Sequence, residues 1–292
     1  MAGLKEIRKR IGSVKSTRQI TKAMKMVAAA KFRKAQTRIL ELRPYADKMH
    51  SVLGRLAGTV EKGHPLLEVR PRKKVEVMVL TSDKGLCGAF NANIMKAAAK
   101  LVREIQSEER EISISAIGKK GVDLFKRKGV VVRRTWTGIS GRISYLNAVE
   151  IAADIAKNYT DELFDEVVLV YNEFKSALTQ KISVVRLLPL AKVADFAELP
   201  DAGEEPMNFL FEPSRQAIFD ALLPKNLEIQ VYRALLESQA SEEAARMTSM
   251  ENATKAADDM IDNLTLQYNK ARQASITKEL MDIVGGVEAL KQ

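Results

Sequence analysis

The chain has 292 residues, with 47 Lys and Arg against 37 Asp and Glu, which gives a formal net charge of +10. This length accommodates one or two domains with a sizeable core, and its 46% hydrophobic and 29% charged content is ordinary for a soluble globular protein. A single cysteine (Cys87) and two histidines (His50 and His64) exclude a disulfide framework and leave little for a metal site or a His-based triad, and no apolar run reaches the ~18 residues of a membrane span.

The first fifty residues carry the excess charge. They contain fourteen Lys and Arg and three acids, so they sum to +11 and the remaining residues sum to −1. Such a segment favours an acidic partner, whether nucleic acid, anionic lipid or an acidic protein surface, and a solvated helix face is the alternative. The stretch resembles a transit peptide in composition, but its pattern continues unbroken into a long helix, so we expect it to be mature structure in a reducing cytosol.

Residues 1–60 are expected to form an N-terminal coiled-coil helix, because neither Gly nor Pro occurs between Gly12 and Pro44. Two apolar sets share a spacing of four and three residues, which predicts one stripe interrupted by Arg18 and Lys31. The sets are Ile7, Ile11 and Val14, then Ile20, Met24 and Val27.

Residues 72–190 are expected to form a central α/β domain. Strands are predicted at 75–80, 112–117, 130–136, 167–171 and 181–190, and helices at 89–106, 119–128 and 144–158. This alternation predicts a mostly parallel, Rossmann-like sheet covered by helices, with the last two strands as a hairpin.

Residues 191–224 are expected to be a Pro-rich connection, since five of the eight prolines fall in 189–224, and residues 225–292 a second coiled-coil helix. Its sixty residues without Gly or Pro would extend roughly 90 Å. The steps of three and four define a heptad seam. Pairing with the N-terminal helix in one antiparallel coil is the preferred interpretation, and an intermolecular dimer is the alternative. The seam residues are Met247, Met250, Thr254, Ala257, Ile261, Leu264, Tyr268, Ala271 and Ser275.

Chemistry is sparse along the chain. The loop SDKGLCG (82–88) lies where nucleotide folds bind phosphate, yet it matches neither glycine-rich fingerprint, so a structural turn or a partner contact through Asp83 and Lys84 is favoured. Cys87 and Trp136 are read as packing residues, and the acid pairs at 242–243 and 258–259 as solvated helix faces. We find no nucleophile–base pair and no cofactor or metal motif, which predicts a non-catalytic chain.

Two classes of function fit these features. A coiled-coil nucleic-acid binder would use the basic segment, although its only aromatics are Phe32 and Tyr45. A mechanical or scaffolding shaft would use the long helix itself, with its termini inserted into a partner whose acidic loops meet the basic residues.

Three segments resemble the gamma subunit family of F-type ATP synthases: ITKAMKMVAAAKFRKAQ (20–36), SDKGLCGAFN (82–91) and YNKARQASITKELMDIVGG (268–286). The resemblance implies a central rotor shaft in a ring of alpha and beta subunits, with the epsilon subunit and the membrane c-ring at its foot. It implies a non-catalytic part of a proton-transporting ATPase, without cofactor or nucleic acid, that couples c-ring rotation to conformational cycling of the catalytic beta subunits. The expected location is peripheral, at the cytoplasmic face of a bacterial inner membrane.

The resemblance also implies contact residues. Those facing the beta subunit would be Lys22, Met24, Lys25, Lys84, Arg272, Gln273, Thr277 and Glu279. Those facing the c-ring would be Lys31, Arg33, Lys34, Phe209 and Glu212. Rod packing or solvated charge is the alternative for each.

Overall fold

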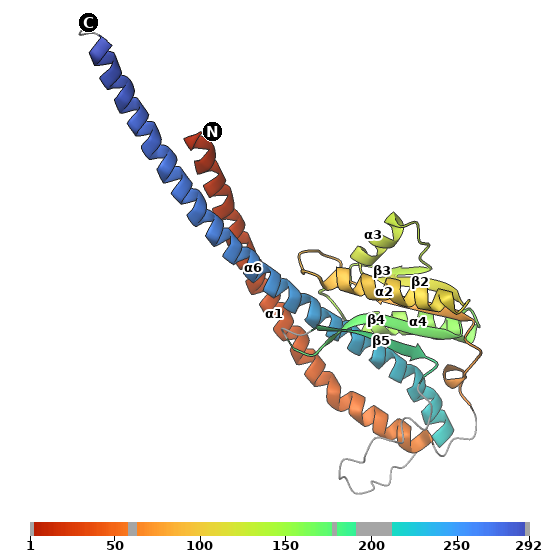
Figure 1. Cartoon of the computed structure of the whole chain (residues 1–292). Helices are drawn as coiled ribbons and strands as arrows, with labels where there is room; N and C mark the ends of the chain where they lie inside the picture. The colour runs from red at the N-terminus through yellow and green to blue at the C-terminus, as the bar shows by residue number, and fades with distance from the viewer. Residues whose placement is uncertain (1–2, 58–62, 177–179, 191–211, 290–292) are drawn as a thin grey trace. The chain divides into compact units, whose positions relative to one another are not determined.

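The computed structural model describes residues 3–57, 63–176, 180–190 and 212–289. Two long helices dominate it, α1 (Leu4–Ala57) and α6 (Arg215–Ala289). The chain divides into two compact units: Met1–Ala28 with Arg246–Gln292, called here the coil unit, and Ala29–Ala245, called here the head unit. Each long helix contributes to both units (Figure 1).

The coil unit is an antiparallel pair of helices formed within one chain. Thr254 Oγ1 donates to Thr21 Oγ1 at 2.8 Å, Arg18 pairs with Asp258 at 2.9 Å, and Lys25 pairs with Glu251 at 3.2 Å. As the residue number of the α1 partner increases, that of the α6 partner decreases, which confirms the expected antiparallel coil. Every residue of the predicted α6 seam is buried or half-buried, whereas most residues between the seam positions are exposed.

The α1 stripe was predicted only in part. Ile7, Ile11 and Val14 face the seam, but Ile20 and Val27 are each 57% exposed. The seam instead continues through Arg18, Thr21, Lys25 and Ala28, which keep the three-and-four spacing begun by Ile7. The heptad spacing therefore decides which α1 residues lie at the seam, even where those residues are charged. Arg18 and Lys25 keep their charged ends at the edge of the seam, where they pair with Asp258 and Glu251.

The head unit contains a five-stranded sheet in the order β3-β2-β1-β4-β5. Its strands are β1 (Lys74–Leu80), β2 (Glu111–Ile117), β3 (Arg134–Trp136), β4 (Glu166–Phe174) and β5 (Gln180–Leu188). The first four are mutually parallel, and β5 runs antiparallel to β4, as the expected hairpin requires. The carboxyl ends of the four parallel strands consequently meet at one edge of the sheet.

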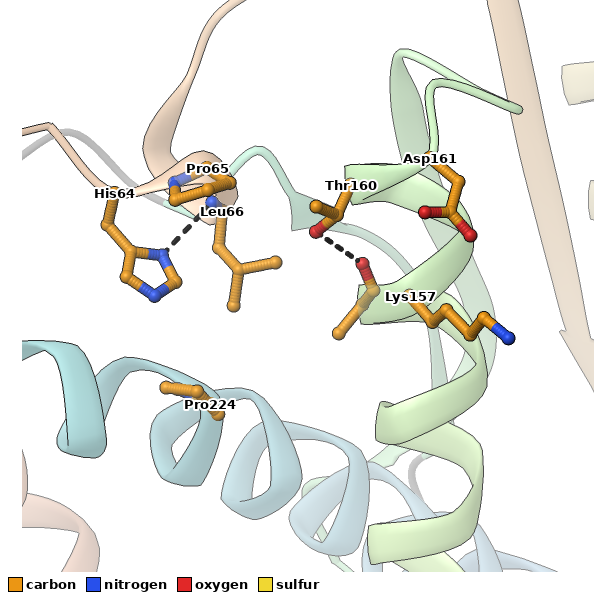
Figure 2. A pocket seen from close by; sticks show the side chains of 8 residues that line it. His64, Pro65, Leu66, Lys157, Thr160, Asp161 and Pro224 are labelled. Atoms are coloured by element: carbon orange, nitrogen blue, oxygen red, sulfur yellow. Dashed lines mark hydrogen bonds between the residues drawn. The ribbon is translucent and has the colours of Figure 1, made fainter.

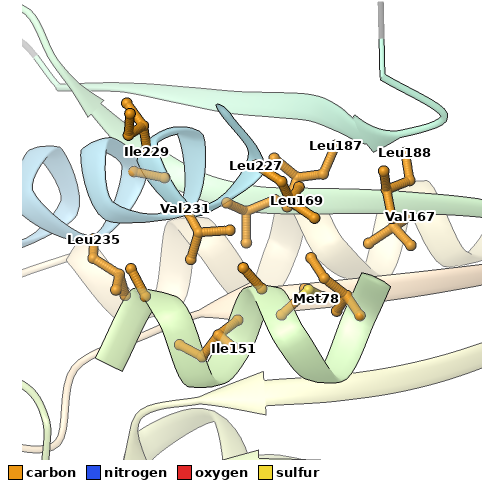
Figure 3. Packing of buried hydrophobic residues seen from close by; sticks show 14 of the residues in the cluster. Met78, Ile151, Val167, Leu169, Leu187, Leu188, Leu227, Ile229, Val231 and Leu235 are labelled. Atoms are coloured by element: carbon orange, nitrogen blue, oxygen red, sulfur yellow. The ribbon is translucent and has the colours of Figure 1, made fainter. Parts of the chain in front are cut away.

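Helices cover both faces of this sheet. On one face, α2 (Phe90–Ser107) and α3 (Lys119–Arg127) pack on Val75, Val77 and Val79. On the other, α4 (Tyr145–Thr160) and the head-unit parts of α1 and α6 form a larger core. Figure 3 shows Ile151 of α4 and Leu227, Val231 and Leu235 of α6 gathered around Met78 and Leu169 of the sheet. A short 3-10 helix, η1 (Pro65–Leu67), precedes β1.

Two boundaries differ from expectation. Helix α6 begins at Arg215 and contains Pro224, because Phe219 and Leu223 are almost fully buried and their burial offsets the cost of about 3 kcal/mol for a proline inside a helix. Strand β3 spans only Arg134–Trp136, because the Val130 N–H donates to Phe125 at the end of α3 and Val131 is 88% exposed. The rest of the expected connection, 191–211, lies outside the described residues.

Candidate functional site

The first group of expected contact residues lies on α1 in the coil unit. Lys22 is exposed and Met24 is half-buried beside the seam. Lys25 is committed to Glu251 across the coil, at 3.2 Å. Ile20 and Val27, which the seam leaves out, add exposed apolar area to the same stretch of helix. The stretch thus presents both positive charge and apolar surface to solvent.

The second group lies near the end of α6. Arg272, Gln273, Thr277 and Glu279 are all exposed. The Thr277 hydroxyl donates to the Gln273 carbonyl at 3.0 Å, and Glu279 accepts from Ser275 at 3.3 Å. Because Lys25 opposes Glu251, Arg272 lies about 30 Å further along α6. The structure therefore places these two groups of expected contact residues at separate levels along the coil.

The residues expected at the foot are not brought together. Arg33 and Lys34 are exposed on α1, while the half-buried Lys31 reaches Glu243 at 3.6 Å. Glu212, also exposed, precedes the first turn of α6, and about 40 Å of that helix separates Arg215 from Glu243. Phe209 lies outside the described residues.

The loop at 82–88 is built from its own hydrogen bonds. The Ser82 N–H donates to Asn91 Oδ1 at 3.0 Å, Ser82 Oγ donates to the Lys84 carbonyl at 2.6 Å, and Asn91 Nδ2 donates to Cys87 Sγ at 3.3 Å. Cys87 is 2% exposed, consistent with a packing residue. The Lys84 side chain is exposed. The loop is therefore a structural turn held by hydrogen bonds among its own residues and Asn91, and its Lys84 side chain faces solvent.

Asp83 places its carboxylate at the amino terminus of α3. Its Oδ1 accepts the backbone N–H groups of Lys119, at the start of α3, and Gly138, at 2.9 and 3.1 Å, and its Oδ2 accepts that of Ser140 at 2.8 Å. A helix amino terminus at the carboxyl edge of a parallel sheet favours an anion. Here the chain supplies the anion itself, at the helix that follows β2.

Four buried glutamates of α6 were missed by sequence reasoning. Glu242 and Glu243 were expected on a solvated face, yet they are 5% and 2% exposed. Ser140 Oγ donates to Glu242 at 2.6 Å, and Tyr171 OH donates to Glu237 at 3.3 Å. Tyr145 OH donates to Glu228. The sequence did contain a signal for this burial, because a run of small residues on a helix indicates close packing. These small residues are Ala240, Ser241 and Ala244, and each is fully buried.

A second polar cluster lies inside the sheet. Glu76, fully buried on β1, accepts from Ser115 and from Arg133 Nε at 3.1 Å, and Arg133 also pairs with Asp154 at 2.7 Å. Burial alone lowers the pKa of Arg133, but the hydrogen bond that it donates to Asp154 and the charge of Glu76 raise this pKa above its usual value. Arg133 therefore stays charged and ties the residue before β3 to β1 and α4.

One open pocket of about 350 Å³ lies between η1, α4 and Pro224. His64 Nδ1 accepts the Leu66 N–H at 3.1 Å, and burial lowers the pKa of this imidazole. Figure 2 shows the Lys157 side chain directed away from the imidazole. The pocket contains no nucleophile–base pair. Across the described residues there is no group of three metal-ligating side chains and no helix long and apolar enough to cross a membrane.

Comparisons with known proteins agree with this architecture. The family model described as ATP synthase matches residues 3–290. The ATP synthase gamma chains of Anaeromyxobacter sp. (strain Fw109-5) and Geobacter sp. (strain M21) are each 49% identical, over the whole of both chains.

Solved structures of ATP synthases contain chains that are similar to this one. A chain of the Tetrahymena thermophila mitochondrial ATP synthase central stalk and c-ring is 28% identical, with a TM-score of 0.58 over 80% of this chain and 99% of that one. A chain of the Euglena gracilis mitochondrial enzyme, 23% identical with a TM-score of 0.65 over 98% of this chain and 94% of that one, shares the fold. With the family model spanning both long helices and the sheet between them, this chain belongs to the ATP synthase gamma chain family.

Proposed function

We propose that this chain is the central rotor shaft of an F-type ATP synthase, a peripheral and non-catalytic subunit. In this role the coil unit occupies a ring of alpha and beta subunits. The head unit contacts the epsilon subunit and the membrane c-ring at the cytoplasmic face of a bacterial inner membrane. The observation that supports it best is 49% identity to gamma chains over the full length, which includes both helices of the coil.

The physical mechanism is a conformational bias. A shaft changes a catalytic site only if its contacts differ between the states of that site, because a ligand shifts an equilibrium by its differential affinity alone. The two zones of the coil, around Met24 and around Arg272, present different chemistry at different heights. Rotation then offers each beta subunit in turn an apolar and cationic contact at one height and a hydrogen-bonding contact at another.

The proposed beta contacts are the exposed residues Lys22, Lys84, Arg272, Gln273, Thr277 and Glu279, the half-buried Met24, and Lys25, which also pairs with Glu251. For the foot, we propose Glu212 together with Phe209. Arg33 and Lys34 form a second basic contact some distance away along the helices, with Lys31 anchored on Glu243. The four segments at 1–60, 72–190, 191–224 and 225–292 remain our proposed division into shaft, head and connection, with residues 215–224 of the connection forming the first turns of α6.

The test is reconstitution. The chain is added to purified alpha and beta subunits, and ATP hydrolysis is measured. A stable complex with strongly raised, sustained hydrolysis is expected. If partners that are competent with another gamma chain give neither complex nor activity, the proposal is wrong, and salt-dependent DNA and RNA binding becomes the next measurement.

A further inference from the structure

One loop of the head unit is held by three different parts of the chain. This segment, residues 137–144, follows β3 and leads into α4, and we call it the joint loop. It leaves the carboxyl edge of the sheet, where the ends of β1, β2 and β4 also lie. Gly138 and Gly141 have φ values of 79° and 82°, so the loop follows a path that other residues rarely adopt.

The sheet holds the joint loop through Asp83. Its carboxylate accepts the N–H groups of Gly138 and Ser140 at 3.1 and 2.8 Å. The same carboxylate accepts the Lys119 N–H at 2.9 Å, so α3 is fixed by the same group. Hydrogen bonds to a charged acceptor are the stronger kind, and three of them fix the position of Asp83.

Helix α6 holds the joint loop through Glu242. Ser140 donates its hydroxyl to this carboxylate at 2.6 Å, while its N–H is bonded to Asp83. The helix is close-packed here, since Ala240, Ser241 and Ala244 are fully buried. The Ser241 hydroxyl also donates to the carbonyl of Asn172, at the end of β4, at 3.4 Å.

Helix α1 holds the other end of the loop. Arg38 Nη1 donates to the Ile143 carbonyl at 3.0 Å. Lys31 Nζ lies 3.4 Å from the position that a Cβ on Gly141 would take and pairs with Glu243 of α6. The joint loop is therefore bonded to the sheet and to both long helices.

We infer that the joint loop, through the hydrogen bonds that link Asp83, Ser140 and Glu242, fixes the sheet with α2, α3 and α4 against rotation relative to α1 and α6. The loop thereby transmits torque between the sheet and these two helices. Apolar packing alone is non-directional and lets a helix turn or slide against a sheet. Hydrogen bonds weaken steeply when their angle changes, so they resist that movement. Ser140 and Glu242 are positioning residues in this account, and the torque-bearing role rests on the proposed function above.

The first experiment uses the isolated full-length chain and does not depend on that function. Spin labels are placed on two exposed positions, Lys96→Cys on α2 and Gln36→Cys on α1, and the width of their distance distribution is measured. Ser140→Ala is expected to broaden this distribution by about 1.5-fold or more, since one directional restraint is lost. Thr137→Ala is the matched control: this side chain is exposed in the same loop and its hydroxyl bonds no described residue.

Glu242→Gln tests the chemistry, because its amide oxygen still accepts from Ser140 and should keep the distribution narrow. Unchanged widths in Ser140→Ala would overturn the inference. Equal broadening in Ser140→Ala and Thr137→Ala would also overturn it, since general loosening of the loop would then explain the effect. Circular dichroism checks that each variant is folded.

The second experiment tests torque in the complex with alpha and beta subunits. A bead is attached at Lys96→Cys on α2 or at Gln36→Cys on α1, and its angular variance is measured during pauses of ATP-driven rotation. Ser140→Ala should raise the angular variance of the α2 bead about twofold and leave that of the α1 bead unchanged. An unchanged variance of the α2 bead, or equal increases in variance for both beads, would refute the torque role. Failure of the unmodified chain to form a rotating complex would instead refute the proposed function.

Discussion

At the scale of single residues, the head unit depends on charges that the chain satisfies internally. Asp83 accepts three backbone N–H groups from the start of α3 and from the joint loop, and Glu242 accepts a hydroxyl from the joint loop. Each carboxylate holds segments that are far apart in the sequence. Removing one should therefore cost more than removing an ordinary surface charge.

Asp83→Ala should lower the free energy of unfolding by about 2 kcal/mol, because three N–H groups lose a charged acceptor at a partly exposed site. Urea unfolding followed by tryptophan fluorescence measures this, since Trp136 ends β3 next to the joint loop. Asp123→Ala is the control, because that carboxylate has no hydrogen bond within the described residues. Equal losses for the two variants would contradict the expectation.

Tyr171 should make stability depend on alkaline pH. Burial and the nearby charge of Glu237 raise the pKa of this phenol well above its usual value near 10. The folded state therefore retains a proton that the unfolded state loses, so this contribution is complete below pH 10 and declines above it. Between pH 9 and 11 the unmodified chain should lose about 1 kcal/mol more than Tyr171→Phe. Parallel pH profiles of the two proteins would show that the phenol does not contribute.

At the scale of elements, the coil is organised by its heptad frame rather than by hydrophobicity. Ile261 is 9% exposed at the seam, whereas Ile20, an equally apolar side chain on the facing helix, is 57% exposed. Small and polar seam residues such as Ala28 and Thr21 bring the helices close but contribute little apolar area. The few large seam residues therefore provide a large share of the stability of the coil.

Ile261→Ala should destabilise the coil by about 2–3 kcal/mol, while Ile20→Ala should change its stability by less than about 0.5 kcal/mol. Thermal unfolding followed by circular dichroism at 222 nm distinguishes the two variants. Comparable destabilisation by Ile20→Ala would mean that the seam had been assigned to the wrong face of α1.

Within the sheet, Arg133 and Glu76 should behave as a coupled pair. Arg133→Met leaves a fully buried carboxylate without its cation, at a cost of about 3–5 kcal/mol. Adding Glu76→Gln removes the stranded charge and should restore a large part of that loss. A double-mutant cycle by chemical denaturation measures the coupling, and strictly additive effects would argue against it.

At the scale of the whole molecule, charge and exposed apolar area lie on the same part of α1. Lys22 and Met24 are available to a partner, and Ile20 and Val27 extend that surface. An acidic loop on the ring would be attracted here without a rigid pocket, which suits a contact that must form and break in every turn. The strength of this attraction should then decide how well rotation is coupled.

Met24→Lys adds a charge at this surface and should lower coupling. In reconstituted vesicles, ATP hydrolysis should remain within about twofold of normal, while protons pumped per ATP fall by about half or more, because the added attraction impedes turning. Met24→Leu changes the side chain without adding charge and is the control. Normal pumping by Met24→Lys would refute the proposed contact.

The sequence by itself determined the elements and the family. The alternation of strand and helix segments, the heptad pattern and the placement of Gly and Pro predicted the parallel sheet, the β4–β5 hairpin and the α6 seam, because these depend on local spacing. The three motif segments identified the family, which the full-length relatives then showed.

Only the tertiary structure decided which polar residues are buried. Ile20 and Glu242 were assigned to the wrong environments, because the partner helix and the joint loop determine the exposure of these side chains. The role of Asp83 depends on N–H groups 36 and more positions away, at Lys119, Gly138 and Ser140. Contacts between segments so distant in the sequence leave no periodic signal, and only folding brings their groups within hydrogen-bonding distance.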